Sequence, residues 1–172
     1  MILDCGNGLE LRPITVDDTD ELLKWRNSDE VKKYFIYQKD ISREEHLSWL
    51  ENKVSTGKVV QFIIHNRIKD VDIGSVYIQD IDSNHKKGEY GIFIGDLENN
   101  VIHGGSAVCK TVVDYAFNEL DLHRLYLRVH ETNTRAIKSY ENAGFTREGL
   151  LRDDVCINGE YINIVWMGIV NE

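Results

Sequence analysis

The sequence predicts a mixed α/β fold with a mainly antiparallel sheet of six to seven strands, flanked by helices. Three apolar stretches, at 59–64, 73–81 and 88–95, follow one another with short polar turns between them, which favours antiparallel neighbours. From residue 106 the apolar period becomes helical, and strand, helix and hairpin patterns follow it. The predicted order of elements is therefore β-α-α-β-β-β-α-β-α-β-β.

The N-terminal part of the chain has the pattern of one strand followed by short helices. Residues 9–15 alternate apolar and polar side chains, as a half-buried strand does. Thr15 is expected to begin a helix with acidic residues in its first turn, where the helix dipole favours them. The segment 27–40 is polar with interleaved aromatic residues and predicts a helical turn and a loop. Ser42 and Glu45 have capping-box spacing, which predicts the start of a further helix.

The C-terminal part begins with a long helix from residue 106, whose apolar residues recur every three to four positions and form a broad buried face. Residues 123–130 form a strand pattern. A short helix follows, with Asn133 at its start and Tyr140 near its end. Two further strands surround Asn158-Gly159, a strong signal for a two-residue hairpin turn.

The composition limits the classes of protein to which the chain can belong. The 172 residues are expected to form a single domain spanning 1–172. A net charge of −9 argues against nucleic-acid binding, which needs clustered Lys and Arg, and is compatible with a basic or amine-bearing partner. The first residues lack the pattern of a signal peptide, and no stretch approaches the ~20 apolar residues of a membrane span. We therefore expect a cytoplasmic protein with no membrane partner.

The cysteines and histidines do not predict a metal site. Cys5, Cys109 and Cys156 are widely separated and odd in number, which favours reduced thiols over a disulfide framework. No C-x-x-C pair occurs, and no two histidines lie at i, i+4 with a glutamate between them. Motifs of P-loop nucleotidases, dinucleotide dehydrogenases and serine hydrolases are also absent.

Three motifs occur together. A strand ends in a Gly-rich loop that opens a long helix (IFIGDLENNVIHGGSAV), a second strand leads to NTRAIKSYENAGF, and the terminal hairpin contains NGEYINIVWMGI. With this combination the chain resembles the GCN5-related N-acetyltransferase (GNAT) superfamily over essentially its whole length. The C-terminal half resembles the branch that acetylates protein N-termini, ribosomal proteins among them, and polyamines. The stretches KWRN at 24–27 and EEHLSWLE at 44–51 instead resemble acetyltransferases of nucleotide-linked amino sugars.

The resemblance implies acetyl-CoA as co-substrate, no metal, and transfer of the acetyl group to a primary amine by direct attack on the thioester. His103, Gly104, Gly105 and Ser106 would contact the pyrophosphate, because free N–H groups at a helix N-terminus favour phosphate. The family pattern is Gln/Arg-x-x-Gly-x-Gly/Ala, so Asn100 departs from its leading residue and His103 stands where the first glycine is expected. Four explanations stay open: His103 tolerates the glycine geometry, Gly104 shifts the register, His103 contacts a phosphate, or cofactor binding is weakened.

The resemblance also implies a fork in the sheet. In the family, the strand at 89–95 splays from the strand at 124–130, and the pantetheine arm of the cofactor lies between them. Phe93 and Ile94 would contact this arm through their backbone. Asn133 would support it from the opposite side, although Asn is also a preferred helix N-cap.

Tyr140 is implied as the general acid that protonates the leaving thiolate, whereas a tyrosine in an ordinary short helix would be a core residue. A tyrosine with a pKa of about 10 protonates a thiolate with a pKa of about 8.5 only at a cost of about 2 kcal/mol. Either the hydroxyl mainly hydrogen-bonds the developing thiolate, or the site lowers the pKa of Tyr140.

The general base is less well defined. Some relatives carry a glutamate five residues before the Asn, where this chain has Arg128. Glu89 is the first candidate base and His130 the second, and either is open to a purely structural role. Loss of the usual glutamate favours an amine of low pKa, such as a protein N-terminus or an amino sugar. An α-amine is about one-tenth neutral at pH 7, whereas a lysine-like amine is neutral only about once in 2,500 molecules.

The first two helices and the terminal hairpin are expected to form the acceptor pocket, with Trp25, Arg26, Tyr34 and Tyr37 as candidate lining residues. Trp25 also fits core packing, and Arg26 also fits an exposed charge at a helix end. The rival function is a non-catalytic module of the same fold that binds an acyl-CoA or an amine. A homodimer is compatible with the open sheet edges of this fold.

Overall fold

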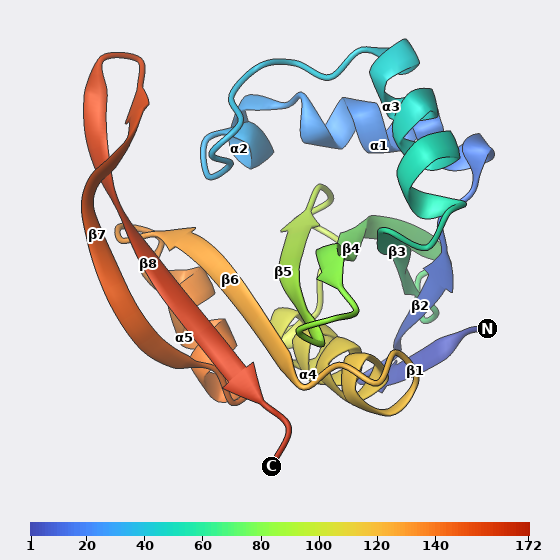
Figure 1. Ribbon diagram of the computed structural model, residues 1–172. Coiled ribbons are helices and arrows are strands. Elements are labelled where there is room, and N and C mark those ends of the chain that lie inside the picture. Colours follow the sequence, from blue (N-terminus) through green and yellow to red (C-terminus); the bar gives the residue numbers. More distant parts are fainter.

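The computed structural model describes residues 1–172 and contains one eight-stranded sheet with helices on both faces (Figure 1). The strand order is β1-β2-β3-β4-β5-β6-β8-β7. The strands are β1 (Leu3–Gly6), β2 (Leu9–Pro13), β3 (Val60–Asn66), β4 (Val71–Asp82), β5 (Lys87–Ile94), β6 (Arg124–His130), β7 (Thr146–Ile157) and β8 (Glu160–Val170). The helices are η1 (Val16–Asp18), α1 (Thr19–Arg26), α2 (Asp29–Lys32), α3 (Arg43–Trp49), η2 (Leu50–Val54), α4 (Gly104–Asn118) and α5 (Thr134–Asn142).

The predicted mixed, mainly antiparallel sheet is confirmed, and the eighth strand is the short β1, which the sequence did not reveal. Six of the seven neighbouring strand pairs are antiparallel, and only β5 and β6 run parallel. Their register covers only Lys87–Glu89 against Arg124–Tyr126. Beyond this point β5 continues along β4 and β6 continues along β8, so the sheet opens into the predicted fork.

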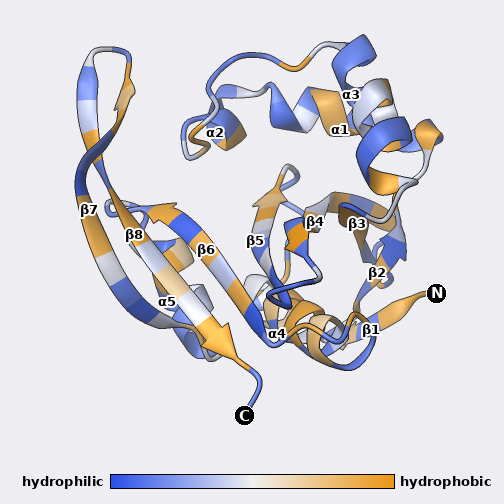
Figure 2. Cartoon of the chain, in the orientation of Figure 1, coloured by the Kyte–Doolittle hydropathy of each residue, from blue (hydrophilic) through white to orange (hydrophobic).

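The helices divide between the two faces of the sheet. The apolar stripe of α4 is fully buried, with Val108, Val112 and Ala116 each 0% exposed, and it packs with α5 in the main core. On the opposite face, Leu22, Trp25 and Val31 of α1 and α2 pack against Ile63 and Phe93 in a second, smaller cluster. Figure 2 shows hydrophobic colour along α4 and hydrophilic colour over much of α3. No helix combines the length and apolarity needed to cross a membrane.

Local signals in the sequence explain most helix and turn boundaries. The Ser42 hydroxyl accepts from the Glu45 N–H (3.1 Å) and the Glu45 carboxylate accepts from the Ser42 N–H (2.7 Å), so the predicted capping box is confirmed. Asn158 and Gly159 both have positive φ, as the predicted hairpin turn requires. The helix expected directly after Thr15 begins instead with the 3₁₀ turn η1, and α1 follows from Thr19.

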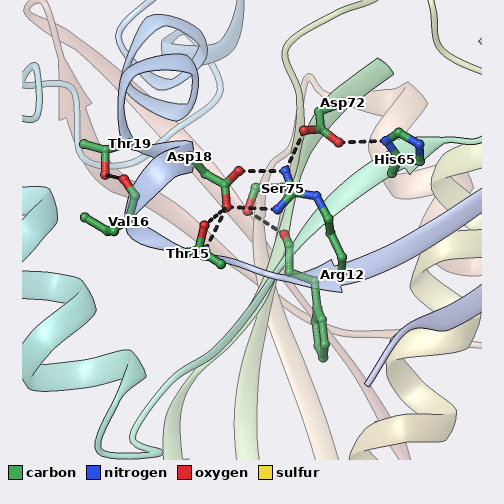
Figure 3. Close-up of polar contacts among 9 residues, drawn as sticks. Arg12, Thr15, Val16, Asp18, Thr19, His65, Asp72 and Ser75 are labelled. Atoms are coloured by element: carbon green, nitrogen blue, oxygen red, sulfur yellow. Dashed lines mark hydrogen bonds and ion pairs between the residues drawn. The ribbon is translucent and has the colours of Figure 1, made fainter. Parts of the chain in front are cut away.

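A polar network joins the start of α1 to the sheet (Figure 3). The Arg12 guanidinium on β2 donates to both oxygens of Asp18 (3.0 and 2.6 Å) and to Asp72 of β4 (2.6 Å). Asp72 in turn contacts Nδ1 of His65 at 2.9 Å. The Thr15 N–H also donates to Asp18 at 2.7 Å. This network fixes the position at which the chain leaves β2 for η1 and α1.

Candidate active site at the β5–β6 fork

One large cavity of about 1570 Å³ lies at the fork. Its walls come from α1, the loop after α2, β5, the N-terminus of α4, β6 and α5. It is lined by the residues predicted for cofactor binding and acceptor binding and by the first base candidate and Tyr140: Trp25, Arg26, Tyr34, Tyr37, Glu89, Phe93, Ile94, His103, Gly104, Gly105, Ser106, Asn133 and Tyr140. The second base candidate, His130, does not line it; it is buried at the end of β6 against the ring of Tyr34.

The loop before α4 keeps the geometry of a glycine loop although it carries a histidine. His103 is the N-cap of α4, with left-handed dihedral angles of φ 60° and ψ 14°. The register is not shifted, because Gly104 and Gly105 are already the first helical residues. A Cβ on Gly105 would lie 3.1 Å from Ser139 Oγ, so a side chain there would crowd α5. The N–H groups of Gly105 and Ser106 have no acceptor within the chain and are suited to an anion.

Helices α4 and α5 are tied together where they border the cavity. The Ser106 hydroxyl lies 3.2 Å from the Ser139 carbonyl oxygen and 3.1 Å from Ser139 Oγ. Asn133 is the N-cap of α5, and its Oδ1 accepts from the Ala136 N–H at 3.3 Å. The Asn133 amide nitrogen has no partner within the chain, so capping leaves its two donors available toward the cavity.

Tyr140 lies near the end of α5, on the same side of the sheet as α4. Its ring makes an edge contact with Tyr90 of β5, at a centroid distance of 5.9 Å, and packs against Phe145. Burial raises the pKa of Tyr140 above its usual value. Burial therefore favours the alternative in which the protonated Tyr140 hydroxyl donates a hydrogen bond to the developing thiolate.

The edge of β5 beyond Glu89 is available to an extended ligand. Residues 90–94 pair with β4 on one side, and β6 has already separated from them on the other. Phe93 is 8% exposed, and its ring contacts Phe35 at a centroid distance of 5.8 Å. The side chains of Phe93 and Ile94 are thus held by the core, while their strand borders the cavity.

The candidate acceptor residues differ in their surroundings. Trp25 is 6% exposed, and a side chain at Gly95 would overlap its indole ring, so Trp25 forms both core and cavity wall. Tyr34, by contrast, is 45% exposed and free to meet a ligand.

Arg26 is buried, so the alternative of an exposed charge at a helix end is wrong. It donates to the Tyr37 carbonyl at 2.8 Å and stacks on Phe35, with 3.7 Å between Cζ and the ring centroid. Burial without a carboxylate partner lowers the pKa of Arg26. Arg26 therefore holds the loop after α2 against α1.

Two lining residues, Gln79 and Arg128, were not among the predicted site residues. Glu89 is 5% exposed and accepts three hydrogen bonds. Arg128 Nε donates to Oε1 at 2.6 Å and Arg128 Nη2 donates to Oε2 at 3.2 Å, while Gln79 Nε2 donates to Oε2 at 3.0 Å. Alternation within each strand is visible in the sequence, but the register of β5 with β6, which places Glu89 and Arg128 on one face, is not.

The comparisons with known proteins agree with this geometry. Residues 8–146 match the family model described as an acetyltransferase (GNAT) domain. The chain belongs to the GNAT family. The expected acyltransferase activity, as an N-acetyltransferase that uses acetyl-CoA, is thereby confirmed at the level of the family.

Relatives of known name and structure cover nearly the whole chain. It is 28% identical to a spermidine N(1)-acetyltransferase of Vibrio cholerae serotype O1, over 94% of this chain and 92% of that protein. Among solved structures, spermidine N-acetyltransferase from Vibrio cholerae in complex with CoA and spermine superposes with a TM-score of 0.88 and 25% identity, over 96% of each chain. A dodecameric structure of that enzyme matches with a TM-score of 0.81 and 25% identity, over 96% of this chain and 95% of the other.

Proposed function

We propose that this N-acetyltransferase transfers the acetyl group to a primary amine of a polyamine, with Tyr140 as general acid. The observation that carries the proposal is that the α4 N-terminus, the β5–β6 fork and Tyr140 border one cavity. The relative named for spermidine and the net charge of −9 favour a cationic acceptor. This acceptor differs from the low-pKa amine that the absent glutamate at Arg128 favours by itself. The dodecameric relative favours self-association, of which a homodimer is the simplest form.

The residues around the cavity fit acetyl-CoA as co-substrate. The N–H groups of Gly105 and Ser106, at the positive end of the α4 dipole, would hold the pyrophosphate, and His103 would supply the turn. The pantetheine arm would lie in the fork, with the backbone of Phe93 and Ile94 on one side and the Asn133 amide on the other. The thioester would then lie between the strands, within reach of Tyr140.

The chemistry follows from this arrangement. The nitrogen of an uncharged amine attacks the thioester carbonyl carbon, so that a C–N bond forms and the C–S bond breaks. The departing sulfur receives a hydrogen bond and then a proton from the Tyr140 hydroxyl, and the proton lost by the amine returns to the tyrosine through water. Because burial raises the pKa of Tyr140, the hydroxyl is fully protonated at neutral pH and ready to donate.

The test is thiol release from acetyl-CoA with spermidine, spermine, a peptide with a free N-terminus, and an amino sugar as acceptors. We expect the polyamines to give the highest kcat/KM. Tyr140→Phe should lower kcat by roughly 10²–10⁴-fold with an unchanged Kd for acetyl-CoA, measured by calorimetry. Tyr115→Phe is the matched control, because Tyr115 lies on α4 outside the cavity.

Each part of the proposal has an outcome that contradicts it. Unchanged turnover in Tyr140→Phe contradicts the acid role. A higher kcat/KM with the peptide or the amino sugar contradicts the polyamine acceptor. Binding of acetyl-CoA without thiol release in the presence of any amine supports the non-catalytic module.

A further inference from the structure

The Glu89 carboxylate lies at the root of the fork, the point at which β5 and β6 separate. Glu89 is the last residue of β5 in register with β6, where its partner is Tyr126. Arg128 lies two residues further along β6, after the backbones have separated, and its guanidinium bridges the gap to Glu89. Gln79 reaches the same carboxylate from β4 on the other side. Side chains of three adjacent strands therefore meet at one carboxylate in the cavity wall.

The three donors do not use the full accepting capacity of this carboxylate. An ionised carboxylate offers about four lone-pair positions, two on each oxygen. Oε2 accepts from both Arg128 Nη2 and Gln79 Nε2, whereas Oε1 accepts only from Arg128 Nε. One accepting position is left, on Oε1, and Glu89 lines the cavity.

Arg128 also has a neighbour on β8, the strand on the other side of β6. It is paired across the strands with Trp166 of β8, and its Cζ lies 6.0 Å from the centroid of the indole ring. The Trp166 ring stacks on Tyr126 at 5.4 Å with an interplanar angle of 11°. The hydrogen bond with Glu89 raises the pKa of Arg128 further, so the guanidinium is a permanent cation.

We propose that Arg128 and Gln79 are positioning residues that hold the Glu89 carboxylate in place with one accepting position open, on Oε1, for an N–H of the acceptor amine. This inference rests on the proposed function and identifies how the amine is oriented. As the amine nitrogen attacks the thioester, it gains positive charge. The hydrogen bond from its N–H to Oε1 therefore strengthens in the transition state. Glu89 then acts as a fixed acceptor that stabilises this charge, and no net proton transfer to it is needed.

The pH profile of kcat/KM tests the positioning role. In Arg128→Gln, Glu89 keeps a buried carboxylate without its cation, so protonation of Glu89 becomes easier. A limb due to Glu89 should then appear nearer neutral pH than in the wild type, in addition to the limb set by ionisation of the acceptor amine. In the double variant Glu89→Gln/Arg128→Gln this displaced limb should disappear. Arg128→Lys keeps the cation but not the two-pronged contact, and should retain the wild-type limb with at least tenfold lower kcat.

A matched control is present on the same strand. Arg124 of β6 makes a similar two-pronged pair with Glu148, at 2.6 and 2.5 Å, and neither residue lines the cavity. Arg124→Gln should leave both kcat and the pH profile unchanged. If circular dichroism shows that Arg128→Gln is poorly folded, Arg128→Lys and Glu89→Gln replace it in the test. Glu89→Gln should lower kcat/KM at least tenfold.

The outcomes separate this inference from the proposed function. Wild-type protein that acetylates polyamines, with an Arg128→Gln profile identical to that of Arg124→Gln, overturns the positioning role and leaves the proposed function intact. A displaced limb that persists in the double variant also overturns it, because the titrating group is then not Glu89. Wild-type protein without activity toward any amine instead contradicts the proposed function.

Discussion

Replacement of His103 by glycine tests whether the loop before α4 acts through its backbone. His103 has a left-handed φ of 60°, which costs a residue with a Cβ about 1–2 kcal/mol. Glycine removes this cost but adds about 0.4–1 kcal/mol of conformational entropy to the unfolded chain. The net expectation is a gain of about 0.7 kcal/mol in the free energy of unfolding, which corresponds to a rise in Tm of about 1–3 °C for a chain of this size.

The same variant separates the explanations for the histidine. His103 is exposed and makes no side-chain hydrogen bond, while the N–H groups of Gly105 and Ser106 remain in His103→Gly. We therefore expect the Kd for acetyl-CoA, measured by calorimetry, to stay within twofold of the wild type. Asp153→Gly is the matched control for the gain in stability, because Asp153 has a φ of 52° and lies outside the cavity. A loss of stability, or a tenfold weaker Kd, would refute this reasoning and indicate that the imidazole contacts a phosphate.

Two further predictions concern η1 and α3. Burial of Asp18 raises its pKa, but the hydrogen bonds from Arg12 and from the Thr15 N–H outweigh this effect, and the net pKa is lowered. Its stabilising contribution is therefore complete above the unfolded value of about 3.9 and is lost as the pH falls through the folded pKa. Urea unfolding from pH 7 to pH 3 should show the stability difference between wild type and Asp18→Asn shrinking below about pH 4, and parallel curves would contradict this. Ser42→Ala should lower the free energy of unfolding by about 1 kcal/mol through loss of the α3 cap, with the exposed Ser48→Ala on the same helix nearly neutral; equal effects would argue against the cap.

The features that the sequence predicted well depend on neighbours along the chain. The Ser42–Glu45 capping box, the Asn158-Gly159 turn and the apolar stripe of α4 each involve residues within four positions or a strictly repeated spacing. The motif around Asn133 and Tyr140 is also local. Its resemblance to a family predicted that these residues lie near the loop before α4, and all of them line one cavity.

The features that the sequence did not reveal depend on distant contacts. For Arg26, the sequence left a ligand-binding role and an exposed charge at a helix end open, because its burial comes from the loop that folds back over it at Phe35 and Tyr37. In the sequence, Arg128 was notable only because some relatives have a glutamate at this position. Its contact with Glu89 spans 39 positions of sequence and is set by the three-residue register of a parallel strand pair, which no local pattern encodes.

The alternation of β5 gives one strand a place in both halves of the proposed reaction. Tyr90 points toward α5 and packs against Tyr140, whereas its neighbour Glu89 points to the opposite face and meets Arg128 and Gln79. A thioester held in the fork would thus have its proton donor on one face and the amine-facing carboxylate on the other. A shift of one residue in the β5 register would exchange these faces, so the short paired segment at the root of the fork determines the orientation of both. We therefore expect substitutions in α1 and α2, which pack on the face of β5 that carries Phe93, to leave Tyr140 in place on the other face.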